Sequence, residues 1–111
     1  MVSSKVFLLA VLSCAAPALA VEKPTLYSEA PCRGISQTIE PNENCTIVSA
    51  DLKGKVSGAT VPEALICNFY KDEKCEDPVI VGLEDPGVCD FDEFEATNKT
   101  VAVVCSKSET N

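Results

Sequence analysis

Short apolar segments rich in Val, Ile, Thr and aromatic residues recur along the chain, separated by clusters of Pro, Gly, Asn and Asp. A spacing of about eight to twelve residues between such turns is typical of an all-β sandwich or barrel. Turn signals stand at 41–44, 51–54 and 84–87. The pattern predicts strands at 25–28, 35–39, 46–48, 56–61, 64–70, 79–83, 88–91 and 100–105.

Two of these strands carry apolar side chains on both faces. The two-residue period groups Leu65, Cys67 and Phe69 on one face of 64–70, and Val101, Val103 and Cys105 on one face of 100–105. The opposite faces carry Ala64, Ile66, Ala102 and Val104. Such strands are usually central and covered on both sides. The alternative is an exposed apolar patch that binds a partner.

The sequence contains a repeated phrase, LYSEAPCRG at 26–34 and FYKDEKCED at 69–77. Tyr27 and Cys32 return as Tyr70 and Cys75, and each phrase is followed by two further cysteines. We therefore expect two homologous units, at about 26–67 and 69–105. A unit of about 40 residues is too small to sustain its own core, so the two should share one.

The first phrase resembles the Greek-key signature of the βγ-crystallins. Tyr27 is followed after four residues by Cys32, in the second aromatic position, and then by Gly34. The resemblance implies an all-β fold, a small disulfide-rich sandwich of two Greek-key-like four-stranded repeats. Gly34 allows a positive φ where the first hairpin folds over. Asp77 stands at that position in the second copy and tolerates this conformation better than most residues.

The calcium motif of that family has its nearest counterpart at 42–47, and the match fails at Glu43 and Ile47. We therefore expect no metal site and no cofactor.

Residues 1–20 are predicted to be a signal peptide. Lys5 provides the positive region, 6–13 form a short apolar region, and Ala18-Leu19-Ala20 is a cleavage signature ahead of Val21. The mature chain, 21–111, should be a single secreted, extracellular domain. A second interpretation of the leader is a bacterial lipoprotein box that ends at Cys14.

Six cysteines remain after cleavage, and an even number in a short exported chain predicts three disulfides. They are Cys32, Cys45, Cys67, Cys75, Cys89 and Cys105. The pseudo-symmetry favours the pairs Cys32–Cys45, Cys75–Cys89 and Cys67–Cys105.

Two N-glycosylation sequons are present, Asn44-Cys45-Thr46 and Asn98-Lys99-Thr100. Asn98 is the favoured site, because it lies in a polar stretch ahead of an apolar strand. Cys45, within the other sequon, can enter a disulfide before a glycan reaches Asn44.

Without Lys5, the mature chain has 8 basic against 17 acidic residues, a net charge of −9. This charge argues against binding to nucleic acid or to anionic membranes. We expect a monomer whose partner is an extracellular protein or glycan. A basic partner would suit the charge, although an acidic surface also serves solubility alone.

Histidine is absent, which removes the commonest general base, and we expect no enzyme activity. Two carboxylates from the acidic run at 90–95 could in principle hydrolyse glycosides, but so small a domain offers little room for a cleft. The run could instead bind a hard cation, or dock a basic partner with Phe91 and Phe94 as anchors. The simplest interpretation is a solvated loop whose two phenylalanines cover the edge of the core.

The leader, the six cysteines and the acidic mature chain resemble small secreted cysteine-rich proteins of filamentous fungi, many of which are candidate effectors. This resemblance implies a non-catalytic recognition protein, a fungal effector or virulence-associated protein acting on a host or competitor. The alternative is a secreted toxin or enzyme inhibitor with a compact β fold. An inhibitor would present a rigid loop, for which 41–44 and 84–87 are candidates.

Overall fold

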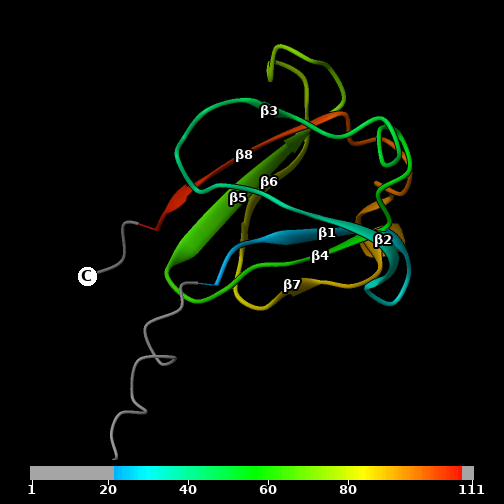
Figure 1. Cartoon of the computed structure of the whole chain (residues 1–111), viewed down its shortest axis with the longest axis horizontal. Helices are drawn as coiled ribbons and strands as arrows, with labels where there is room; N and C mark the ends of the chain where they lie inside the picture. Colours follow the sequence, from blue (N-terminus) through cyan, green and yellow to red (C-terminus); the bar gives the residue numbers. More distant parts are fainter. Residues whose placement is uncertain (1–21, 109–111) are drawn as a thin grey trace, which may run out of the picture.

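The computed structural model describes residues 22–108, which form two four-stranded antiparallel sheets around one core (Figure 1). The strand orders are β2-β1-β4-β7 and β3-β8-β5-β6. The strands are β1 (Thr25–Glu29), β2 (Arg33–Thr38), β3 (Thr46–Ile47), β4 (Gly58–Thr60), β5 (Leu65–Tyr70), β6 (Pro78–Glu84), β7 (Gly87–Val88) and β8 (Ala102–Lys107). The signal peptide expected at 1–20 lies outside the described residues. Within 22–108, no helix has the length and hydropathy needed to cross a membrane.

The predicted all-β class is confirmed, and each predicted strand overlaps an observed one. The largest difference concerns 88–91, where the strand ends at Val88 and a short 3-10 helix, η2 (Phe91–Phe94), follows. The Asp90 side chain caps this helix by accepting a hydrogen bond from the Asp92 N–H at 3.0 Å. Such a cap satisfies an N–H group that the first turn of a helix leaves free.

The two units exchange their third strands. β3 follows β1 and β2 in the chain but pairs with β8, whereas β7 follows β5 and β6 but pairs with β4. Each sheet therefore contains three strands from one unit and one from the other. β5, which begins at Leu65, is the first strand of the second unit, so Cys67 lies in that unit and not, as expected, at the end of the first.

One apolar core lies between the sheets. It contains Leu26, Ile39, Val48, Leu52, Val56, Ala59, Val61, Leu65, Cys67, Phe69, Ile80, Phe91, Ala96, Val103 and Cys105. Phe69 on β5 and Phe91 in η2 meet edge to face with ring centroids 5.4 Å apart. As predicted, β5 and β8 are central strands, but their outer faces are only partly covered: Ala102 is buried, Ile66 and Val104 are half-buried, and Ala64 is exposed.

The loops that connect the first two strands of each unit share one backbone feature, a cysteine with a positive φ. We call 29–33 and 71–77 the first and second arches. Cys32 and Cys75 occupy the same position in each and have positive φ values of 53° and 56°. Gly34 has the expected positive φ, 85°, and a Cβ there would collide with the Ser28 hydroxyl. Asp77 does not adopt the positive φ expected of the second copy. Backbone hydrogen bonds to the Asp72 carboxylate close that arch instead.

The disulfides are Cys32–Cys89, Cys45–Cys75 and Cys67–Cys105. The third pair agrees with the prediction, and the predicted Cys32–Cys45 and Cys75–Cys89 pairs are wrong. The cause is the strand exchange: Cys45 precedes β3 and Cys89 follows β7, so each lies in the sheet that contains the other unit's arch. The two bridges still obey the pseudo-symmetry, since exchanging the units converts one into the other.

Phe91→Ala should lower the free energy of unfolding by about 3–5 kcal/mol, the usual cost of truncating a buried phenylalanine. Phe94→Ala is the matched control, because Phe94 is 48% exposed and Phe91 is fully buried. Guanidinium unfolding of the oxidised proteins measures both. Equal effects would contradict the assignment of Phe91 to the core.

Non-reducing peptide mapping should recover Cys32 linked to Cys89 and Cys45 linked to Cys75. Trypsin combined with a Glu-specific protease is suitable, because cleavage after Glu76 and Glu84 separates Cys75 from Cys89. Recovery of Cys32 linked to Cys45 would contradict the exchange of third strands.

Candidate functional site

The largest exposed apolar side chains that lie together are on β6 and η2. Val81 is 70% exposed and Phe94 is 48% exposed, and both line a hollow of about 350 Å³ together with Val79 and Leu83. We call these four residues the edge patch. Contiguous exposed apolar surface on a small soluble domain commonly marks an interaction site.

The register of β6 explains why Val81 is exposed. Between the pairs Cys67↔Leu83 and Phe69↔Ile80, two steps along β5 correspond to three along β6, and a second irregularity lies before Tyr70↔Pro78. An extra residue interrupts the alternation of faces, so a bulge can turn an apolar side chain outward. β6 is also at the edge of its sheet, where bulges hinder pairing with another chain.

Charged groups border the edge patch. A second hollow of about 260 Å³ shares Val79 and Phe94 with it and is also lined by Lys71, Pro78, Glu95 and Lys99. The Lys71 Nζ atom lies 3.7 Å from an Asp77 carboxylate oxygen. The patch therefore offers an apolar centre with charges of both signs at its rim.

The two phenylalanines of the acidic run do not act together. Phe91 is fully buried in the core, whereas Phe94 is half-exposed in the edge patch. The expectation that both phenylalanines cover the edge of the core is therefore wrong, because Phe91 belongs to the core itself and only Phe94 lies at the surface. Phe91 packs edge to face against Phe69 on β5, whereas Phe94 lines the hollow beside β6.

Two carboxylates of the run make local hydrogen bonds. Asp90 caps η2, and the Asp92 carboxylate accepts a hydrogen bond from the Thr97 hydroxyl at 2.5 Å. Among residues 22–108, no group of three or more Cys, Asp or Glu side chains is arranged to hold a metal ion.

Polar groups of the stretch 42–47 also make local contacts. The Asn42 side chain accepts from the Asn44 N–H at 3.0 Å, and the Thr46 hydroxyl donates to the Asn44 carbonyl at 3.4 Å. Glu43, with a φ of 69°, donates its N–H to the Cys105 carbonyl. The Asn42 side-chain oxygen and the Thr46 hydroxyl are therefore engaged in local hydrogen bonds.

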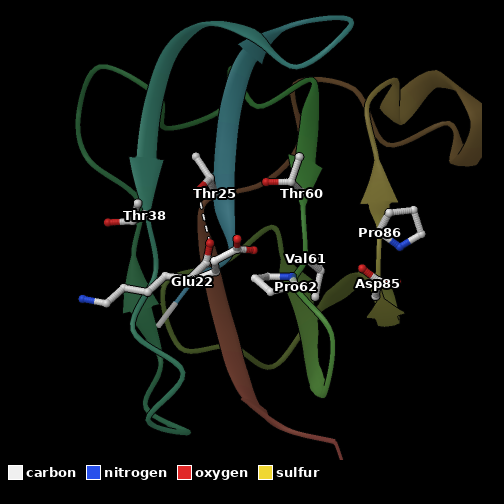
Figure 2. A pocket seen from close by; sticks show the side chains of 9 residues that line it. Glu22, Thr25, Thr38, Thr60, Val61, Pro62, Asp85 and Pro86 are labelled. Carbon is white, nitrogen blue, oxygen red and sulfur yellow. Dashed lines mark hydrogen bonds between the residues drawn. The ribbon is translucent and has the colours of Figure 1, made fainter. Parts of the chain in front are cut away.

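An open groove of about 580 Å³ lies on the first sheet (Figure 2). Thr38, Thr25 and Thr60 form a row across β2, β1 and β4, because Thr25 is paired with both of the others. Pro62, Asp85 and Pro86 lie along one side of this row (Figure 2). We call this site the threonine groove. The 84–87 turn, a candidate inhibitor loop, thus forms part of its rim.

The other predicted sites are the disulfide cysteines and the sequon asparagines. All six cysteines are in disulfides, and Asn44 and Asn98 are both exposed. The edge patch was missed, because the apolar run at 79–81 predicts a strand without indicating that this strand lies at an edge.

The second arch is closed by one carboxylate. Asp72 accepts hydrogen bonds from the backbone N–H groups of Lys74, Glu76 and Asp77 at 2.9–3.2 Å. The bond from Asp77 is the largest cause that holds the pKa of Asp72 below its ordinary value of 3.8. This cluster, predicted as hairpin-tip charges, therefore fixes the loop that carries Cys75.

Solved structures with the same fold are βγ-crystallin domains. The chain superimposes on domains from Clostridium beijerinckii (TM-score 0.61, 13% identity, 77% of this chain and 98% of that chain) and Flavobacterium johnsoniae (0.64, 11%, 81% and 100%). It is also similar to a domain of the Abundant Perithecial Protein from Neurospora crassa in its Ca²⁺-bound form (0.63, 12%, 83% and 98%). No protein-family model and no curated protein matches the sequence. The likeness confirms the predicted βγ-crystallin-like fold.

Asp72→Asn should destabilise the protein at neutral pH and have less effect in acid. Because the folded-state pKa is lowered, the carboxylate's contribution is complete above the unfolded-state pKa, about 4, and is lost as the pH falls through the folded-state value. Melting temperatures from neutral pH to about pH 2 measure this change. Glu63→Gln, at an exposed position, is the control for removal of one negative charge. A difference in Tm that stays constant to the lowest pH would contradict this role of Asp72.

Proposed function

We propose that this chain is a secreted, non-catalytic recognition protein that binds an extracellular protein partner through the edge patch. In this proposal it acts as a fungal-type effector or virulence-associated protein on a host or competitor. The exposure of Val81 and Phe94 side by side is the observation that carries the proposal. A cross-linked domain presents such side chains on a rigid surface, so little conformational entropy is lost on binding.

The chemistry of the partner follows from the composition of the patch. An apolar anchor from the partner would fill the hollow of about 350 Å³ beside Phe94. The charge of −9 on the mature chain favours a partner with basic residues around that anchor. Aromatic residues in such positions commonly provide a large share of the binding energy.

The cysteines support an extracellular site of action. Three intramolecular disulfides suit an oxidising compartment and leave none of the six mature cysteines as a free thiol. The sequence has no histidine, the commonest general base, and the disulfides leave none of the six mature cysteines as a thiol nucleophile. Recognition is therefore a better interpretation than catalysis.

Calcium binding, which the Neurospora crassa domain displays, is not part of the proposal. The stretch of this chain nearest to the family's calcium motif, 42–47, departs from it at Glu43 and Ile47, and Asn42 and Thr46 make local hydrogen bonds.

A toxin or enzyme inhibitor is the second candidate function, and the threonine groove is the feature that favours it. Its row of three hydroxyls beside Asp85 and Pro86 would suit polar groups of a glycan or of an enzyme surface. The groove has no aromatic residue in its lining, which is why the edge patch is preferred. A toxin would impair sensitive cells when added pure, whereas an effector would alter host immune readouts without impairing them.

Phe94→Ser should weaken capture of the partner from host extracellular fluid by about tenfold or more, since truncation of a central anchor commonly costs about 2 kcal/mol. The immobilised, oxidised mature protein serves as bait, and quantitative mass spectrometry compares captured proteins between wild type and variant. Ile35→Ser is the matched control, because Ile35 on β2 is 50% exposed and Phe94 is 48% exposed.

The result expected is a protein retained by wild type and Ile35→Ser but lost with Phe94→Ser. A partner retained equally by both variants would place recognition elsewhere. In that case Thr25→Val combined with Thr60→Val tests the threonine groove.

A further inference from the structure

Thr100 is a buried polar residue whose hydroxyl the fold does not use. The side chain is fully buried just before β8. Within the described part of the chain, its Oγ1 atom has no hydrogen-bond partner. A hydroxyl taken out of water without a partner costs free energy. Valine would have a methyl group in its place and would suit a buried position next to a strand, so folding alone favours valine here.

The hydroxyl belongs to a chemical motif instead. Thr100 is the third residue of Asn98-Lys99-Thr100, and a hydroxyl at this position is what the N-glycosylation sequon requires. We propose that Asn98 carries an N-linked glycan and that the Thr100 hydroxyl serves this modification rather than the fold. The proposal does not depend on the recognition function above.

The transfer reaction has defined partners. The side-chain nitrogen of Asn98 forms a bond with the anomeric carbon of an oligosaccharide linked to a lipid pyrophosphate. The bond from that carbon to the pyrophosphate oxygen breaks, the pyrophosphate leaves with the electron pair, and the amide loses one proton. Because Thr100 is fully buried in the folded protein, the transferase must read it before this segment folds.

The folded structure can accommodate the product. Asn98 is exposed and has a φ of 63°, a turn conformation that asparagine tolerates well. Its backbone N–H donates to the Val56 carbonyl at 3.0 Å, and the Thr100 carbonyl accepts from the Gly54 N–H at 2.9 Å. The loop at 54–56 thus holds the backbone on each side of Lys99 while the Asn98 side chain stays accessible.

The other sequon, Asn44-Cys45-Thr46, provides an internal comparison. The Thr46 hydroxyl donates to the Asn44 carbonyl, so that threonine has a contact in the fold. Its middle residue, Cys45, is bridged to Cys75. A structural role explains Thr46, whereas none explains the hydroxyl of Thr100.

The glycan would be a neighbour of the edge patch. Lys99, which follows Asn98, lines the 260 Å³ hollow that Phe94 and Val79 share. A glycan at Asn98 would therefore border the proposed recognition surface.

The test is secretion of the full chain, with its own leader, from a yeast that performs N-glycosylation. Wild type, Asn44→Gln, Asn98→Gln, Thr100→Ser and Thr100→Val are compared by intact mass before and after treatment with peptide N-glycosidase, which converts a glycosylated asparagine to aspartate. Wild type, Asn44→Gln and Thr100→Ser should carry a glycan at Asn98. Asn98→Gln should carry none there, and Thr100→Val should lower occupancy by about tenfold or more.

Stability provides a second readout that separates modification from folding. Without the glycan, Thr100→Val should melt a few degrees above the Thr100 protein, because it removes a buried unpaired hydroxyl. The unglycosylated reference is the wild-type chain produced in oxidised form by a host without N-glycosylation, because Gln in place of Asn98 at a φ of 63° would itself be strained. An unmodified Asn98 in secreted wild type overturns the proposal. A Thr100→Val protein that is less stable than this reference, or that fails to fold, also overturns it, because the hydroxyl would then have a folding role.

Discussion

The exchange of third strands between the two sheets is the constraint on which the rest of this molecule depends. β3 and β7 have two residues each, so each makes only two register pairs with its neighbour in the other unit's sheet. At Gly87 a Cβ would collide with the Ala59 carbonyl, so the close approach of β7 to β4 requires glycine. Pairing this limited provides little stability by itself, and the Cys32–Cys89 and Cys45–Cys75 bridges attach each exchanged strand to an arch.

The two copies stabilise their arches by different means. In the first, Ser28 accepts the Ile35 N–H and Gly34 provides the positive φ. In the second, the Asp72 carboxylate collects three backbone N–H groups, and no glycine is needed at position 77. A cysteine with positive φ stands in each arch, since the bridge to the exchanged strand must leave from that point.

The exposed features that distinguish this molecule lie in segments where the two copies differ. The bulged edge strand β6 and the half-exposed Phe94 belong to the second unit, and the sequon at Asn98 follows them directly. The proposed recognition surface and the proposed glycosylation site therefore lie in the same unit. The first sheet offers a different surface, the row of threonines beside the 85–86 turn.

The sequence by itself determined the strands, the two-unit organisation and the βγ-crystallin-like class, because alternation, turn residues and the Tyr-Cys repeat are local properties of the chain. It also identified Cys67 and Cys105 as buried residues, since their positions share a face with apolar neighbours. Only the tertiary structure decided the other two disulfides, the separate environments of Phe91 and Phe94, and the exposure of Val81. Each of these depends on which strand lies beside which, and pairing between strands distant in the sequence is not encoded in local periodicity. The buried, unpaired hydroxyl of Thr100 likewise became visible only once the neighbours of that side chain were fixed.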